Sequence, residues 1–276
     1  MARRKDATRV KFEEPFHSIV PYIMPKRAEA EVFIRETFDV TDLMEYIKKY
    51  NLENDAKLKF FHCFCYAIAK TIYHRPQMNY FIKGKYYWKR NDISLSFVAK
   101  QQFADGAEEK LMFMVVKPEM TVKEISNIIL GDVKKARETN SNDLDKLMHV
   151  IGIMPRFLIS FIVGFAQTLD FFGIMPSFLM KGDPNYSTAL ISNLGSIGSG
   201  APYHHLSNYG TNSIMITIGT IKEVDGRQKV DIGFTIDERI ADGFYFVKSL
   251  RYVKYALEHP DTLMEKIEDK FPEGVI

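Results

Sequence analysis

The stretch DERIADG, residues 237 to 243, combines residue types that acid–base chemistry uses. It follows KVDIGFTI, whose apolar residues alternate as in a strand, and it precedes an amphipathic run typical of a helix. Glu238 and Asp242 lie four residues apart, and Gly243 begins the helical run. The pattern predicts two carboxylates at a strand-to-helix junction, where one of them could act as a general base.

A second group of candidates lies in ALISNLGSIGSGAPYHHLSNYG. Ser192 and Asn193 end a predicted strand, and His204 and His205 follow it in a polar segment. Adjacent histidines usually point apart, so we expect at most one of them, His205 first, to face a site. A metal held by these histidines and Glu238 would need a further ligand in the right geometry, so we expect no metal site.

Each candidate also has a structural interpretation. Glu238 could be a favourable charge near the positive end of a helix dipole, and Asp242 could cap that helix. Asn193 could hold a turn, and a histidine in a loop is more often a surface residue. Glu238 is a useful base for a thiol or hydroxyl only where burial raises its pKa toward neutrality.

Composition limits the class of protein. The chain has 276 residues and a formal net charge of +2, so it has room for a large core but no strong field for nucleic acid. The start MARRKDATRVKF lacks the apolar run of a secretory signal. Cys63 and Cys65 lie two apart on a predicted helix, so they are expected to be buried thiols of a cytoplasmic protein.

The predicted elements mix strands and helices without regular alternation. LKFFHCFCYAIAKTIYHRP, residues 58 to 76, is a long apolar helix that we expect at the centre of the core. The final third is rich in strands, and Asp225-Gly226 predicts a hairpin turn. We therefore expect one α+β domain, residues 1 to 276, with a mixed or antiparallel sheet.

An unusual apolar segment, residues 141 to 185, interrupts these elements. It contains the repeat GIMPRFL and GIMPSFL, and the uncharged run from 157 to 169 is too short to span a bilayer. We expect an inserted helical hairpin. It could pack on the core or on a sister subunit, cover an apolar substrate, or contact a membrane surface through residues 147 to 180.

Three segments together resemble the chloramphenicol acetyltransferase-like superfamily. They are similar above all to the catalytic domain of the dihydrolipoamide acyltransferases of 2-oxo acid dehydrogenase complexes. The segments are FDVTDLMEYIKKY with the long helix and the strands after it, ALISNLGSIG, and DERIADG in the place of DHRxxDG. The resemblance covers roughly residues 30 to 138 and 186 to 270, and residues 141 to 185 are not part of the pattern.

The resemblance implies a two-layer α/β sandwich that forms homotrimers, with an active site between subunits and acyl-CoA as substrate. It gives Ser192 the role of oxyanion donor and Asp242, with Gly243, a structural role. Glu238 stands where the family has its histidine base. The family also has an early arginine that holds the motif aspartate, and Arg27 is the nearest candidate.

Two functions remain open from the sequence. The first is a stand-alone acyltransferase that uses acyl-CoA and a small or lipid-like acceptor, since no lipoyl-domain or linker pattern precedes the catalytic pattern. Its catalytic residues would be Glu238, Ser192, Asp242 and His205, and Asn193, Gly243 and His204 would contact substrate. The second, which the missing histidine favours, is a silent trimer that binds acyl-CoA or a protein without turnover and could associate with a membrane.

Overall fold

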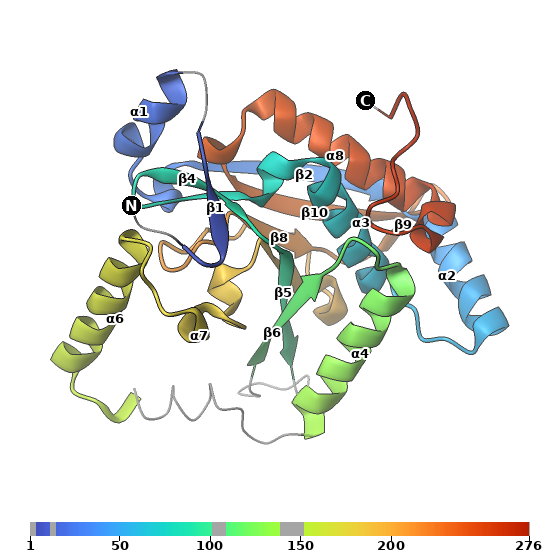
Figure 1. Ribbon diagram of the computed structural model, residues 1–276. Helices are drawn as coiled ribbons and strands as arrows, with labels where there is room; N and C mark the ends of the chain where they lie inside the picture. The colour runs from blue at the N-terminus through green and yellow to red at the C-terminus, as the bar shows by residue number, and fades with distance from the viewer. Residues whose placement is uncertain (1–3, 12–14, 101–108, 139–151, 276) are drawn as a thin grey trace.

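A mixed sheet forms the centre of the computed structural model, which describes residues 4–11, 15–100, 109–138 and 152–275 (Figure 1). Strand β7 is parallel to both of its neighbours, β5 and β8, and the other pairs are antiparallel. The expected α+β class with a mixed sheet is confirmed. The strands, in sheet order, are β2 (Glu31–Asp39), β10 (Arg227–Asp237), β8 (Ile214–Ile218), β7 (Ala189–Asn193), β5 (Ile93–Lys100) and β6 (Glu109–Val116), and β9 (Lys222–Val224) pairs with β10.

Helices cover one face of this sheet. The central helix α3 packs on β5 and lies between α4 and α8, while α2 contacts β10. Its expected place in the core is confirmed, and both Cys63 and Cys65 are buried thiols whose pKa is raised by burial. The described helices are α1 (Pro15–Ile23), α2 (Thr41–Asn54), α3 (Phe60–His74), α4 (Val122–Glu138), α6 (Arg156–Phe171), α7 (Ser177–Met180) and α8 (Gly243–Glu258).

Strand β10 shows why the sheet has two different faces. Its apolar side chains from Val230 to Ile236 alternate toward the helices and join the main core. Gly233, Thr235 and Asp237 face the other way. That second face is covered by residues 199–213, which run across it and bring Ala201 and Pro202 onto the strands. The guanidinium of Arg35 donates to the Ala201 carbonyl at 2.6 Å, and the Thr217 hydroxyl donates to that of Pro202.

A smaller sheet lies beside the main one. Its strands are β1 (Ala7–Val10), β4 (Tyr86–Arg90) and β3 (Tyr80–Lys83), all antiparallel. The turn between β3 and β4 needs Gly84, which has a φ of +61°. A Cβ atom at Gly84 would also lie 2.2 Å from the carbonyl oxygen of Phe171, so the end of α6 rests directly on this turn.

The expected helical hairpin of residues 141–185 is not shown. Residues 141–151 lie outside the described part, and the described residues 152–185 include two helical residues at 152 and 153, the long helix α6 and the single turn of α7. The chain leaves α6 at Gly173, which has a φ of +68°, and Pro176 then stands directly before α7. This break keeps the second repeat from extending into a matching helix.

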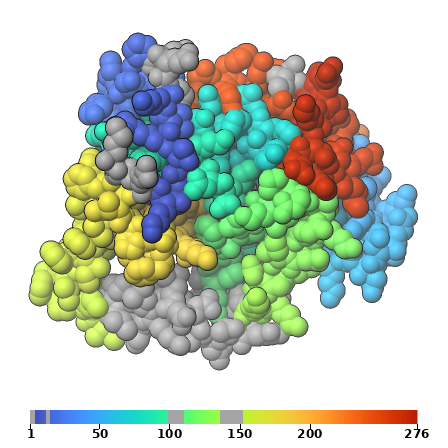
Figure 2. All heavy atoms as spheres, in the orientation of Figure 1, coloured from blue at the N-terminus to red at the C-terminus, as the bar shows by residue number. Residues whose placement is uncertain are grey.

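Helix α6 lies at the edge of the molecule with most of its apolar side chains in solvent (Figures 1 and 2). Phe157 is 77% exposed and Phe161 is 68% exposed, and the Phe161 ring stacks on that of Phe165. The helix is anchored at its C-terminal end, where buried Asp170 pairs with Arg4 at 2.6 Å and with Lys83 at 2.9 Å. Among the described residues, no helix is both long enough and apolar enough to cross a membrane.

Candidate functional site

Ser192 opens onto a cavity of about 640 Å³. It lies on β7 opposite Thr217 of β8, on the sheet face away from the helices. Its hydroxyl is half-buried and makes no hydrogen bond to another described residue. The lining is largely apolar, and its apolar residues come mainly from α3, α4, β5 and β7. A free hydroxyl in an apolar, concave setting can donate to a developing oxyanion more effectively than it could in water.

The backbone turns sharply after Ser192, and Gly195 in this turn packs against the residue that follows β8. A Cβ atom on Gly195 would lie 2.2 Å from the carbonyl oxygen of Gly219, which follows β8. Only glycine allows this approach. The ISNLG pattern therefore has a steric reason: it lets the end of β7 pack on the end of β8 and brings Asn193 into the cavity wall.

His204 and His205 both line the same cavity as Ser192. Their rings stack with centroids 4.8 Å apart, so the expectation that at most one would face the site is wrong. The segment has no regular secondary structure here, and the backbone amide of Leu206 donates to the carboxylate of Glu31. That bond fixes the residue next to His205 and holds both imidazoles on one side.

Glu238 and Asp242 do not lie at the cavity that contains Ser192. Ser192 pairs with Thr217, which pairs with Gly233, whereas Glu238 follows β10 five residues after Gly233. Five residues of strand span about 17 Å, and two strand spacings add about 10 Å across the sheet. Glu238 is exposed and is not part of the cavity wall, so one chain does not bring it to Ser192.

Asp242 caps helix α8. Its carboxylate accepts a hydrogen bond from the backbone amide of Tyr245 at 2.7 Å, which satisfies one of the free amides of the first turn. This agrees with the structural interpretation of Asp242. Gly243 is the first residue of α8, and neither residue lines the cavity that contains Ser192.

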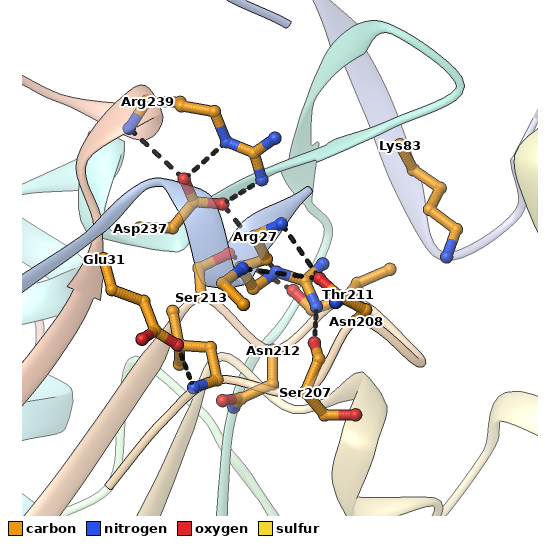
Figure 3. Close-up of polar contacts among 12 residues, drawn as sticks. Arg27, Glu31, Lys83, Ser207, Asn208, Thr211, Asn212, Ser213, Asp237 and Arg239 are labelled. Carbon is orange, nitrogen blue, oxygen red and sulfur yellow. Dashed lines mark hydrogen bonds and ion pairs between the residues drawn. The ribbon is translucent and has the colours of Figure 1, made fainter. Parts of the chain in front are cut away.

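A buried ion network lies next to Glu238 (Figure 3). Asp237 sits between two guanidinium groups: Arg239 donates to it from Nε and Nη2 at 2.7 Å each, and Arg27 Nε lies 3.7 Å away. Burial lowers the pKa of Arg27 to about 10, while Asp237 acts to raise it. The early arginine thus pairs with Asp237, and not with Asp242 as the resemblance implied.

The same network also holds in place the segment directly after the two histidines. Arg27 donates from Nη1 to the carbonyl of Ser207 and from Nη2 to that of Gly210 at 3.2 Å, and its amide donates to Asn208. Asp237 therefore fixes Arg27, and Arg27 fixes the stretch directly after His205. Nothing in the spacing of the sequence indicated this link, because it joins residues about 180 positions apart.

Lys59 and His62 line the cavity from the start of α3, and sequence reasoning missed both. The periodicity that correctly predicted a core helix made His62 look like one more buried position. Its ring nitrogen Nδ1 lies 2.8 Å from the Ser126 hydroxyl of α4, and burial lowers its pKa to about 4. His62 is therefore neutral at pH 7.

This shift of the His62 pKa predicts a pH-dependent stability. Between pH 6.5 and about 4 the unfolded chain binds a proton at His62 that the folded chain does not, so stability is full above this range and falls as the pH falls. The loss should reach about 3 kcal/mol at most. Urea unfolding across this range should show a shallower decline for His62→Asn, whereas exposed His259→Asn should keep the wild-type slope. Equal slopes for all three proteins would contradict this assignment.

Metal binding has no support from the described residues, in which no group of three or more His, Cys, Asp or Glu side chains could hold an ion. Among the described residues that line the Ser192 cavity there is no carboxylate. The arrangement offers a hydroxyl donor, two imidazoles and an apolar pocket, which are groups that acyl transfer can use.

No protein-family model matches the sequence, and no curated protein sequence matches it significantly. Solved structures do match. The probable dihydrolipoamide acetyltransferase from Listeria monocytogenes 4b F2365 is 19% identical, with a TM-score of 0.57 over 90% of this chain and 94% of that chain. A truncated catalytic core of the 2-oxoacid dehydrogenase multienzyme complex from Thermoplasma acidophilum is 15% identical, with a TM-score of 0.60 over 92% and 100%.

A chloramphenicol acetyltransferase is 13% identical, with a TM-score of 0.53 over 91% of this chain and 99% of that chain. At these identities the matches show the fold and not the activity. The order of ISNLG and DERIADG along the chain predicted the same fold. The chain therefore has the chloramphenicol acetyltransferase-like fold, shared with the acyltransferase cores of 2-oxo acid dehydrogenase complexes.

Proposed function

We propose that the protein is a CoA-dependent acyltransferase that moves an acyl group from acyl-CoA to a thiol or hydroxyl acceptor. The observation that supports this most is that Ser192, His204 and His205 all line one largely apolar cavity. Its volume of about 640 Å³ falls in the usual range for small-molecule sites. The fold is one that solved acetyltransferases use.

A homotrimer completes the site in this proposal. Ser192 and Glu238 lie at opposite ends of β7 and β10, which are separated by β8, so Glu238 can reach the Ser192 hydroxyl only from another subunit. Glu238 is exposed and has room for such a partner. Burial between subunits would also supply the desolvation that raises a carboxyl pKa toward neutrality.

The reaction follows from these positions. The base removes the proton from the acceptor thiol or hydroxyl as the acceptor sulfur or oxygen attacks the thioester carbonyl carbon. The carbonyl oxygen becomes an oxyanion and accepts a hydrogen bond from Ser192. The tetrahedral intermediate then expels the CoA thiolate, which takes the proton back from the base. Asn193 and His204 contact the substrate along the cavity wall, and Asp242 with Gly243 holds the start of α8.

His205 is the second candidate for the base, because it shares the cavity with Ser192 within one chain. The acceptor would be small or lipid-like, since most of the wall is apolar. The exposed phenylalanines of α6 support a lipid-like acceptor and a peripheral contact of this helix with a membrane surface.

Release of free thiol from acetyl-CoA and longer acyl-CoAs, with a panel of thiol and hydroxyl acceptors, tests the proposal. Glu238→Gln should lower kcat by about 10²- to 10⁴-fold if Glu238 is the base, and His205→Gln should then have a small effect. The reverse pattern would assign the base to His205.

The second candidate function is a silent member of the fold that binds acyl-CoA or a protein without turnover. It is favoured by the exposed carboxylate at the position of the family's histidine. Acyl-CoA that binds in calorimetry but releases no thiol with any acceptor would support it and contradict the enzyme.

A further inference from the structure

A second cavity, of about 260 Å³, lies apart from the Ser192 cavity and is lined by five cationic side chains. None of the described residues that line it is acidic, and the others are uncharged. We call it the basic cavity. Its cations are Lys26, Arg27, Lys83, Lys85 and Arg239.

Carboxylates compensate these cations only in part. Asp237 is shared by Arg27 and Arg239, and Asp170 is shared by Lys83 and Arg4 outside the cavity. The nearest acid to Lys26 is Glu29, at 3.5 Å on the exposed side. Within the described part of the chain, no carboxylate lies within 4 Å of the Lys85 amine, which donates instead to the carbonyl of Pro21 at 2.7 Å. A positive potential therefore remains in the cavity.

Two further observations concern the buried cations of this cavity. Arg27 is only 4% exposed, and its Nε atom, which lies 3.7 Å from Asp237, makes no hydrogen bond to a described residue. The pKa of Lys83 is lowered by burial, and Arg27 lowers it further, while Asp170 opposes the change. An anion in the cavity would offset the cost of keeping both cations buried and charged.

We propose that the basic cavity binds a phosphate group, carried either by a soluble phosphate ester or by the headgroup of a lipid. Arginine and lysine side chains that converge on one space are the usual partners of phosphate oxygens. The volume suits a phosphate with a small attached group and is too small for a whole dinucleotide. The basic cavity shares no lining residue with the cavity of Ser192.

The surroundings of the basic cavity contain exposed apolar side chains. Tyr22 and Ile23, at the end of α1, are each 64% exposed, and the Lys85 amine lies 5.1 Å from the Tyr22 ring centroid. Phe171, at the end of α6, lines the cavity and is 46% exposed. Figures 1 and 2 place α1 and α6 on the same side of the molecule. A lipid headgroup could therefore enter between apolar side chains that contact the acyl region.

Binding of inorganic phosphate by calorimetry, and of the protein to vesicles of phosphatidylcholine with or without phosphatidic acid, tests the inference. The variant is Lys26→Gln/Lys85→Gln, which removes two accessible charges and leaves the buried Asp237 and Asp170 pairs intact. The matched control is Lys48→Gln, an exposed lysine on α2. The double variant should weaken phosphate or vesicle binding about tenfold or more, and the control should not change it.

The calorimetry and the vesicle measurement together distinguish a soluble phosphate ester from a lipid headgroup. Phosphate binding that the double variant weakens, without retention on phosphatidic acid vesicles, would assign a soluble ester. Retention that needs phosphatidic acid and is lost in the double variant would assign a lipid headgroup. Absence of binding in both arms, or binding that the double variant retains at wild-type strength, would overturn the inference. Circular dichroism of each variant checks that the fold is unchanged.

Discussion

Replacing Asp237 with asparagine is expected to lower the free energy of unfolding by about 3 to 5 kcal/mol. The carboxylate is fully buried and is the acid that Arg27 and Arg239 share. Without it, two guanidinium groups remain in a low-dielectric interior with only carbonyl partners, and that cost is large. Urea unfolding followed by the fluorescence of buried Trp88 would measure it.

Asp39→Asn is the matched control for this prediction. Asp39 also pairs with an arginine, Arg227, but the Arg227 side chain is 53% exposed and that of Asp39 is 25% exposed. We expect a loss below about 1 kcal/mol there, as for other surface pairs. Similar losses in the free energy of unfolding for both variants would show that the burial of Asp237 does not make its ion pairs more stabilising than a surface pair. A loss at Asp237 should also reduce the order of the segment after His205, because Arg27 holds that segment.

Replacing Ser192 with alanine is expected to lower kcat about 10²- to 10³-fold with little change in KM. In the proposed mechanism the hydroxyl donates to an oxyanion that forms only during the reaction, so ground-state binding of acyl-CoA should not depend on it. The assay is the release of CoA thiol under saturating acceptor.

Ser196→Ala is the control in the same cavity. Ser196 also lines it, but its hydroxyl already donates to the carbonyl of Asn193 at 2.7 Å. It should therefore leave kcat within a few-fold of the wild type. A Ser192 variant that keeps full kcat, or one that changes only KM, would remove Ser192 from the oxyanion role. Thermal unfolding of both variants should match that of the wild type, since each change removes one oxygen at the surface of a cavity.

Several elements could be predicted from the sequence because their signals are local. The long apolar run from 58 to 76 predicted the helix that the structure places at Phe60–His74. Asp225-Gly226 gave the hairpin turn, and both residues have a positive φ. The end of the DERIADG stretch likewise gave the cap at Asp242, because capping depends on a few adjacent residues.

Other expectations depended on distant contacts and were wrong or incomplete. The hairpin expected in residues 141–185 is not shown, because residues 141–151 lie outside the described part and a turn at Gly173 separates α6 from the short α7. The histidines were expected to diverge, but their rings stack, and a hydrogen bond from the Leu206 amide to Glu31 holds the residue that follows them. The partner of Arg27 depended on which acid of DERIADG turns inward, and that acid is Asp237.

The sequence by itself determined the fold class and the identity of the candidate groups: Ser192 in ISNLG, the two histidines, and Glu238 where a histidine was expected. Only the tertiary structure decided which of them meet. The direction of neighbouring strands is set by long-range pairing, which leaves no mark on local periodicity. That pairing puts Ser192 with His204 and His205 at one cavity, puts Glu238 at the opposite strand end, and gathers the cations of the basic cavity from separate elements.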